Sequence, residues 1–432
     1  MKKLFACFVV LAMLLPSLFS CCVCLPDNMS GLGDGLLDQF GDKFGMGGFD
    51  VDADESFNGN LNDIWNEDVN ADANEDANVD ANEDANADAN EDANEDAGGN
   101  ENASEDANEN VNENNGTPGL EFVLLSDGTY EVSVGEAIED NIVIPAKYNG
   151  ISVTRIGDFA FSYCSDLVSI TIPDSVTNIG NATFLDCSNL TSITIPDSVT
   201  SIGEGAFYNC SSLASITMSN RVTSIGYATF LNCFNLTSIT IPDSVTSIGE
   251  GAFDGCSNLT SITIPDNVTN IEIGAFYGCS SLTSMTIPFV GETKDGTGYT
   301  NFGYIFGSPS NYYVPSSLKT VVITGGTSID YSAFEDCFSL TSITIPDSVT
   351  SIGGYAFCDC SSLTSITIPN GVTSIGGYAF DDCYNLTSVT FEDPYGWYAV
   401  GYPSISSSDL SSPSTAAYYL TDTYCDETWT RV

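Results

Sequence analysis

Residues 196–241 read PDSVTSIGEGAFYNCSSLASITMSNRVTSIGYATFLNCFNLTSITI and contain two copies of one 23-residue unit. The unit has the consensus S-V-T-S-I-G-x-x-A-F-x-x-C-S-x-L-T-S-I-T-I-P-D. Self-similarity at a fixed period of roughly 20 to 50 residues is typical of solenoids, propellers and repeat arrays. The stretch therefore predicts a solenoid that displays a surface, and it does not indicate what that surface contacts.

The row L-x-x-I-x-I recurs along the chain from Leu167 to Phe391. A row of this kind, L-x-x-L-x-L, with a period of about 20 to 29 residues is the signature of leucine-rich repeats. Because side chains alternate along a strand, both apolar residues of I-x-I face the core. Stacked rows thus predict a parallel sheet on the concave side, and the Pro that follows each row marks the end of the strand.

The rest of each unit forms the return path on the convex side. In one copy, Val199 and Ile202 begin this path, and Gly203 is expected to allow the bend. Ala206, Phe207 and the residues after them are apolar at offsets of three and four. These offsets predict a short helical turn, and a short strand is the alternative.

Units such as SVTSIGEGAFDGCSNLTSITIP resemble those of the BspA-like leucine-rich-repeat proteins of bacterial surfaces. The resemblance covers residues 118–432 and includes an insert at 289–317, which lengthens the Leu-to-Leu spacing from 23 to 36 residues. It implies a secreted or cell-surface protein that adheres to host proteins or to other cells. It carries over no catalytic residues.

Charge and composition exclude several classes of function. The 432-residue chain has a formal net charge of −50, with nine basic residues, 59 acidic residues and no His. Phosphate binding needs a basic surface, so we expect no nucleic-acid partner. Without His, Ser-His-Asp and Cys-His catalysis and His-based metal sites are excluded. We expect no enzyme activity.

Residues 1–20 have the composition of a signal peptide of the lipoprotein type. Two Lys residues precede an apolar run of about twelve residues, which is too short to span a bilayer. The run leads into Leu18-Phe19-Ser20-Cys21, which resembles a bacterial lipobox. In this interpretation Cys21 carries the lipid and provides the only membrane attachment. The alternative is an ordinary cleaved secretory peptide.

Residues 21–117 are expected to form a disordered acidic tether. From Asp27 to Glu113 there are 27 acidic residues and one basic residue, and A-N-E-D recurs within this range. Like charges four residues apart repel in a helix, and almost no large apolar side chain is available to bury. Asp72 begins a D-x-N-x-D motif, but the Gly and Glu of a calcium loop are missing. We expect weak calcium binding at most, and no other cofactor.

Both ends of the repeat region, 161–391, have atypical sequences. Residues 118–160 contain two alternating runs around Asp127-Gly128, which predict a β-hairpin. Residues 392–432 are rich in Trp and Tyr. Terminal units of solenoids seal an exposed core end. We therefore expect an N-terminal hairpin cap and a C-terminal aromatic cap, with an aromatic ligand site as the alternative for the latter.

Two features could bind a partner. The exposed face of the sheet should carry Ser and Thr ladders, which cross-strand hydrogen bonds stabilise without any ligand. The insert breaks this uniform pattern with aromatic residues, which are common interface anchors, although they could instead cover a disrupted core. The candidate partner-binding residues are Tyr299, Phe302, Tyr304, Phe306, Tyr312 and Tyr313 of the insert, and Ser192, Thr194, Ser238 and Thr240 of the sheet.

The repeat also aligns Cys and Asp residues. Nine Cys recur at one position of the unit and should be small buried hydrophobes. Cys358 lies outside this series, so we expect it to face outward as a reactive thiol. An Asp follows the Pro in several rows, as Asp174 and Asp197 do. Turn formation accounts for these Asp residues, and calcium binding between rows is the alternative.

These patterns predict a lipid-anchored surface protein, secreted or on the outer face of a bacterial membrane, that binds a protein or glycan of a host or neighbouring cell. A carbohydrate-binding or nutrient-capture surface lipoprotein that uses the aromatic insert is the alternative.

Overall fold

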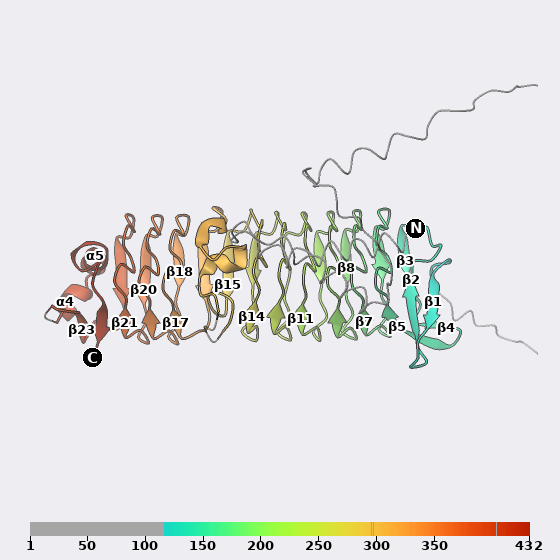
Figure 1. Ribbon diagram of the computed structural model, residues 1–432, viewed down its shortest axis with the longest axis horizontal. Helices are drawn as coiled ribbons and strands as arrows, with labels where there is room; N and C mark the ends of the chain where they lie inside the picture. The colour runs from blue at the N-terminus through green and yellow to red at the C-terminus, as the bar shows by residue number, and fades with distance from the viewer. Residues whose placement is uncertain (1–115, 295, 297, 403) are drawn as a thin grey trace, which may run out of the picture. The chain divides into compact units, whose positions relative to one another are not determined.

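The computed structural model describes residues 116–432 apart from 295, 297 and 403. The signal peptide, the lipid attachment site at Cys21 and the acidic tether lie outside the described residues. In the repeat region the chain winds into successive turns that stack in one row (Figure 1). The predicted leucine-rich-repeat solenoid with parallel strands is confirmed.

Each regular turn contributes a strand of the S-I-T type to a first ladder. In β8 the central Ile193 is buried while the flanking Ser and Thr are exposed, and β8 pairs in register with the next turn, Ser192 beside Ser215. Residues 238–240 form no strand, so the ladder is interrupted there. The strands are β3 (Asn141–Val143), β6 (Ser169–Thr171), β8 (Ser192–Thr194), β10 (Ser215–Thr217), β13 (Ser261–Thr263), β15 (Ser284–Ile287), β16 (Thr320–Ile323), β18 (Ser342–Thr344), β20 (Ser365–Ile368) and β22 (Ser388–Phe391).

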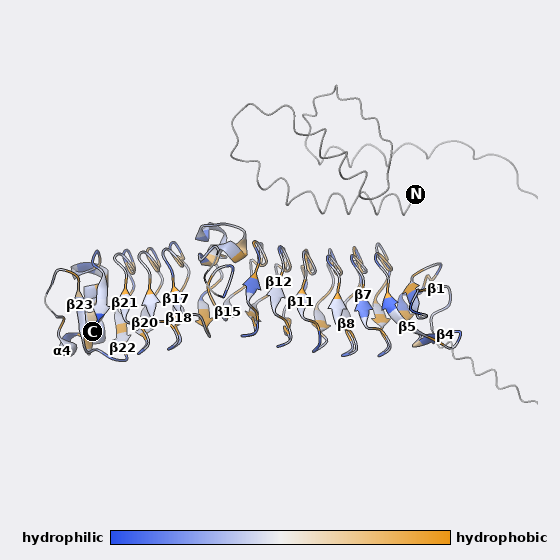
Figure 2. Cartoon of the chain, turned by 60° about the horizontal axis from the view of Figure 1, so that its bottom comes forward, coloured by the Kyte–Doolittle hydropathy of each residue, from blue (hydrophilic) through white to orange (hydrophobic). Residues whose placement is uncertain are grey.

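A second parallel ladder is formed by the S-I pairs of the return path. Ile202 and its counterparts point into the core from these short strands. Figure 2 shows hydrophobic segments recurring from turn to turn along the stack. The strands are β5 (Ile151–Ile156), β7 (Asn178–Ile179), β9 (Ser201–Ile202), β11 (Ser224–Ile225), β12 (Ser247–Ile248), β14 (Asn270–Ile271), β17 (Ser328–Ile329), β19 (Ser351–Ile352) and β21 (Ser374–Ile375).

The return path carries the short strands that were the alternative to helical turns. The segment that follows each of these strands is not helical. The segment around Phe207 consists of consecutive tight turns, because Gly205 and Asn209 have φ angles of 59° and 57°. Such left-handed residues end a right-handed helix. The amide of Phe207 donates to the carbonyl of Thr229 in the next turn of the solenoid, while that of Cys210 donates within its own turn to Phe207. The segment thus forms a third row of backbone hydrogen bonds between turns, in addition to the two strand ladders.

The repeated Gly of S-I-G does not act as a bend. Gly203 has no positive φ, and a Cβ atom on it would lie 2.5 Å from the backbone nitrogen of Asn181 in the preceding turn. Real Cβ atoms do not approach backbone this closely, so glycine is required here for close stacking. The expectation that Gly203 allows a bend is corrected to a packing requirement between turns.

A column of Phe rings occupies the centre of the solenoid. Phe207 and Phe230 have ring centroids 5.4 Å apart and an interplanar angle of 4°, and both are fully buried. The same stacking continues on either side, with neighbouring centroids 5.3 Å apart for Phe184 and Phe207 and 5.4 Å apart for Phe230 and Phe253. Buried aromatic rings contribute large apolar areas, so this column is a major part of the stabilising core.

At the N-terminal end, β1 (Glu121–Leu124) and β2 (Tyr130–Ser133) pair antiparallel, where the sequence predicts a hairpin. β2 continues in parallel to β5, so the hairpin joins the second ladder directly. A short strand, β4 (Lys147–Tyr148), also pairs with β5. The hairpin therefore covers the first turn of the solenoid.

At the C-terminal end, β23 (Trp397–Ala399) and β24 (Trp429–Arg431) form an antiparallel pair, and β24 also pairs with β21. The rings of Trp397 and Trp429 lie 5.2 and 6.1 Å from Phe391, the last apolar residue of the rows. Both Trp side chains are buried against this end of the core, as a cap requires. Between these strands lie α4 (Ser407–Leu410), α5 (Pro413–Tyr418) and the π-helical segment η4 (Tyr419–Thr423).

Candidate partner-binding surface

The polar face of the first ladder is regular and exposed. Ser192, Thr194, Ser238 and Thr240 all lie on the surface. Ser aligns with Ser and Thr with Thr between β8 and β10 and between β13 and β15, whereas β16 places Thr320 and Val322 at these positions. Where the Ser and Thr pattern is regular, neighbouring positions are alike and offer little to select one ligand. Its role in binding a partner stays a prediction.

The insert contains two short 3-10 helices, η2 (Phe302–Phe306) and η3 (Asn311–Tyr313). Phe302, Tyr304 and Phe306 are buried, so their proposed role as exposed partner-binding residues is wrong. Phe306 lies 6.5 Å from Phe276 in the preceding turn, and Phe302 lies 4.9 Å from Phe334 in the following turn. These two rings therefore continue the Phe column through the insert. They connect Phe276 before the insert to Phe334 after it.

The other three aromatic residues of the insert are exposed. Tyr299, Tyr312 and Tyr313 have exposed fractions of 53%, 82% and 45%. Tyr313 packs edge-on against Tyr312 and against Tyr277 of the preceding turn, with centroid distances of 5.1 and 5.3 Å. Tyr277 was not among the predicted residues. Its position directly after the core Phe276 could have placed it on the surface.

Two polar residues that the sequence did not single out hold the insert in place. The side chain of Asn311 is buried; its oxygen accepts from the amide of Gly303 and its nitrogen donates to the carbonyl of Glu335 at 2.6 Å. Glu292 pairs through its backbone with Tyr299, and its carboxylate accepts from the amide of Tyr299 at 3.1 Å. Burial and Glu292 raise the pKa of Tyr304 far above its usual value. The hydrogen bonds of Asn311 and Glu292 therefore fix the backbone that carries the exposed tyrosines.

Eight of the nine repeat cysteines are buried, as the sequence predicts, and Cys164 in the first turn of the series is partly buried. Cys210 donates its thiol proton to the carbonyl of Phe184 in the preceding turn at 3.0 Å, and Cys233 does the same to Phe207 at 3.2 Å. The expectation that Cys358 faces outward is wrong, because only 7% of it is exposed. Burial, followed by the charges of Asp359 and Asp381, raises the pKa of Cys358 to about 12.

We expect Cys358 to resist alkylation in the folded protein. The thiolate is the reactive form, and a raised pKa lowers its population, to about one part in ten thousand at pH 8 for a pKa of about 12. Iodoacetamide labelling followed by peptide mass spectrometry should show modification of Cys358 and Cys233 only after unfolding in urea. Rapid labelling of Cys358 without denaturant would contradict its burial.

The Asp residues that follow the Pro in several rows, such as Asp174 and Asp197, are exposed. Asp197 accepts from the amide of Asn220 in the next turn at 3.0 Å, which is a turn-stabilising contact. Among residues 116–432, leaving aside 295, 297 and 403, no three His, Cys, Asp or Glu side chains converge as metal ligands would. In the same part of the chain, no helix has the length and apolar character that crossing a membrane requires.

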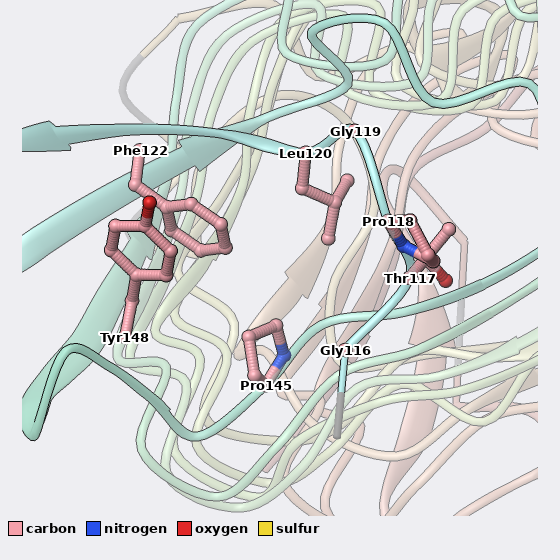
Figure 3. Close-up of a pocket in the computed structure, with 8 residues that line it drawn as sticks. All are labelled: Gly116, Thr117, Pro118, Gly119, Leu120, Phe122, Pro145 and Tyr148. Carbon is pink, nitrogen blue, oxygen red and sulfur yellow. The ribbon is translucent and has the colours of Figure 1, made fainter. Parts of the chain in front are cut away.

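A hollow of about 330 Å³ lies in the N-terminal cap. Figure 3 shows the rings of Phe122 and Tyr148 together on one side of it, with Leu120 and Pro145 beside them. The two rings stack with centroids 4.0 Å apart. The lining contains no charged side chain. Its apolar residues pack against the core, so the hollow belongs to the cap.

Comparison with known families agrees with this architecture. The model of the BspA type leucine rich repeat region matches six copies, over residues 140–257, 224–295 and 309–411, which is more than half of the chain. The chain belongs to the BspA-type leucine-rich repeat family. The matched residues include the turns on both sides of the insert. No curated protein matches this chain.

Solved structures of similar leucine-rich repeat proteins come from several bacteria. A leucine rich cell surface protein from Faecalibacterium prausnitzii is 28% identical over 64% of this BspA-type chain and 94% of its own, with a TM-score of 0.37. A leucine-rich repeat protein from Bacteroides ovatus is 27% identical over 63% and 87%, with a TM-score of 0.35. The pneumococcal vaccine antigen PcpA is 20% identical over 64% and 80%, with a TM-score of 0.28.

Proposed function

We propose that this protein is a non-catalytic cell-surface binding protein that attaches to a protein or glycan on a host or neighbouring cell. The observation that carries the proposal is the cluster of exposed tyrosines at the insert, Tyr312, Tyr313 and Tyr277, whose rings contact one another on the surface. Exposed Tyr side chains combine a large apolar contact area with a polar tip and are frequent anchors of interfaces. Membership of the BspA-type family supports the same role.

The surface location rests on the N-terminal sequence. Residues 1–20 have the features of a signal peptide, and Cys21 follows the lipobox-like motif. In this proposal the lipid at Cys21 anchors the chain, and the acidic segment places the solenoid away from the membrane. Fatty-acid labelling of cells that express the wild type and Cys21→Ala tests the anchor. Equal incorporation of label into both would contradict it.

We expect Tyr312→Ser/Tyr313→Ser to weaken binding at least about tenfold, because the most exposed side chains of the cluster are removed. The full chain would be tested by surface plasmon resonance against a panel of matrix proteins and by glycan array. The thermal midpoint should stay within a few degrees of the wild type because both side chains lie on the surface.

The matched control is Phe234→Ser. Phe234 is an exposed aromatic residue at a repeat position where neighbouring turns carry Ser211 and Ser257. It should leave binding unchanged. If the control and the double variant lose affinity equally, the insert is not the recognition surface. Saturable sugar binding that the double variant loses would favour the carbohydrate-binding alternative over a protein partner.

A further inference from the structure

Three tyrosines form a second aromatic surface in the turns after the insert. Tyr331, Tyr355 and Tyr378 follow β17, β19 and β21, the orange strands of Figure 1. Their ring centroids are 5.5 and 4.9 Å apart in succession. Tyr331 is 64% exposed and Tyr378 is 36% exposed. These three residues form a tyrosine ladder.

Two residues of the tyrosine ladder have a left-handed backbone. Tyr355 and Tyr378 have φ angles of 57° and 59°, a left-handed conformation that is unfavourable for residues with a Cβ atom. The equivalent position is left-handed in other turns as well, where glycine holds it at Gly205 and Gly251 and residues with a Cβ atom hold it at Ala228 and Ser332. The left-handed backbone is therefore a property of the repeat, and what distinguishes these two turns is the Tyr side chain.

Asp381 lies near these rings, and Asp359 and Asp336 follow it in a row of neighbouring acids. The amide of Asp381 donates to the carbonyl of Tyr378, so this acid lies on the same turn as its ring. Burial raises the pKa of Tyr355, and the neighbouring tyrosines and Asp381 add to the shift. Desolvation, followed by the charges of neighbouring aspartates that include Asp359, raises the pKa of Asp381. Desolvation and the neighbouring acids likewise raise that of Asp336.

No basic side chain compensates these charges. In the part of the chain that the structure describes, the two ion pairs lie elsewhere, joining Arg155 to Glu131 and Arg431 to Asp393. The exposed rings of Tyr331 and Tyr378 near uncompensated carboxylates make a surface that attracts organic cations. Lys and Arg side chains satisfy both features, through cation–π contact with the rings and ion pairing with the acids.

We propose that the tyrosine ladder and Asp336, Asp359 and Asp381 form a docking surface for an extended, Lys- and Arg-rich polypeptide segment. The surface repeats from turn to turn, which suits an extended chain that presents one basic side chain after another. The proposal goes beyond the function proposed above, because it uses turns that follow the insert and does not depend on Tyr312 or Tyr313. The same molecule would then bind a second kind of partner, a basic polypeptide segment.

The test uses a labelled dodecapeptide of alternating Arg and Ser, titrated with the full chain and followed by fluorescence anisotropy. We expect Tyr355→Gly/Tyr378→Gly to weaken binding about tenfold or more. Because glycine suits both φ angles, the melting temperature should stay within about five degrees of the wild type. Unchanged affinity in this variant would show that the acidic chain binds the peptide non-specifically, which would overturn the proposal.

The matched control is Tyr163→Gly. Tyr163 is also exposed and left-handed, with φ of 60°, but it lies at the other end of the solenoid. It should bind the peptide like the wild type, and so should Tyr312→Ser/Tyr313→Ser. A loss of peptide binding in either variant would contradict a separate surface at the tyrosine ladder. This result is distinguishable from failure of the insert proposal, which is measured on other ligands.

The acids are tested with Asp359→Asn/Asp381→Asn, which should weaken binding several-fold and reduce its salt dependence. Asn is compatible with the backbone at position 359, since Asn209 and Asn232 hold the same left-handed position in other turns. Spermidine is the second probe. If spermidine binds as tightly as the peptide and displaces it, the surface takes small polyamines and the polypeptide proposal is wrong. Weak spermidine binding supports it.

Discussion

Replacing Phe230 by alanine is expected to destabilise the folded protein by about 3 to 5 kcal/mol. Phe230 is fully buried between Phe207 and Phe253, with centroids 5.4 Å from each. Alanine would leave a cavity that the two neighbouring rings cannot fill without losing their own stacking. Urea unfolding followed by circular dichroism measures the change in the free energy of unfolding.

The control for this prediction lies four residues further along the chain. Phe234→Ser removes an aromatic side chain that is 42% exposed, and surface changes of this kind are usually within about 0.5 kcal/mol. If both variants lost similar stability, the Phe column would not be the principal core. Within the insert, Phe306→Ala should resemble Phe230→Ala, because Phe306 is equally buried and continues the same column.

The fold could be predicted from the sequence because the same pattern of apolar and polar residues recurs in successive units. The alternation in S-I-T determines which side chains face the core, and in every described S-I-T strand the central residue is buried. The cysteine series was interpretable for the same reason, since one position in each unit has one environment. Cys210 and Cys233 make the same hydrogen bond, each to a Phe carbonyl of the preceding turn, and differ only in the turn to which they belong.

The apolar spacing did not distinguish a helical turn from a non-helical return path, because offsets of three and four also arise in consecutive tight turns. The distinguishing signal is present in the sequence two residues after each core Phe. Asn209, Asn232 and Gly255 hold that position, and their φ angles of 57°, 60° and 70° are left-handed. Asn and Gly are the residues that adopt this conformation most readily. Their recurrence at one position argues against a helix.

The insert could be located but not divided into core and surface. Phe302 and Phe306 have the same residue types as exposed anchors, and their burial depends on how η2 meets Phe276 and Phe334. Nothing repeats within the insert, so no second copy shows which side faces inward. Cys358 was misplaced for a related reason, because its orientation follows from the tight turn and not from strand alternation.

Tyr355 and Tyr378 show the opposite case, in which an exception to the repeat can be read from the sequence. Several other turns have Gly, Ala or Ser two positions before the core Phe, and these two turns have Tyr. The ladder depends on close stacking of the turns, since its rings meet only when successive turns are about 5 Å apart. The spacing of the turns therefore determines both how the core packs and whether the tyrosine rings meet on the surface.

The repeated glycine that allows this spacing gives the second large effect. Gly203→Ala should destabilise the protein by about 1 to 3 kcal/mol or more, because the new Cβ would lie 2.5 Å from backbone atoms of Gly180 and Asn181. Those backbone atoms cannot rotate away as a side chain can. Thermal unfolding followed by circular dichroism measures the loss.

The same substitution one turn later is the control, and it should have the opposite sign. A Cβ on Gly226 would meet nothing closer than the Cγ of Glu204 at 3.5 Å, an ordinary contact. With no clash, Gly226→Ala restricts the unfolded chain and is expected to stabilise by about 0.4 to 1 kcal/mol. Equal destabilisation by both substitutions would mean that these glycines are required for backbone conformation, as the sequence alone suggested. Opposite effects would establish that the distance between turns selects glycine at position 203.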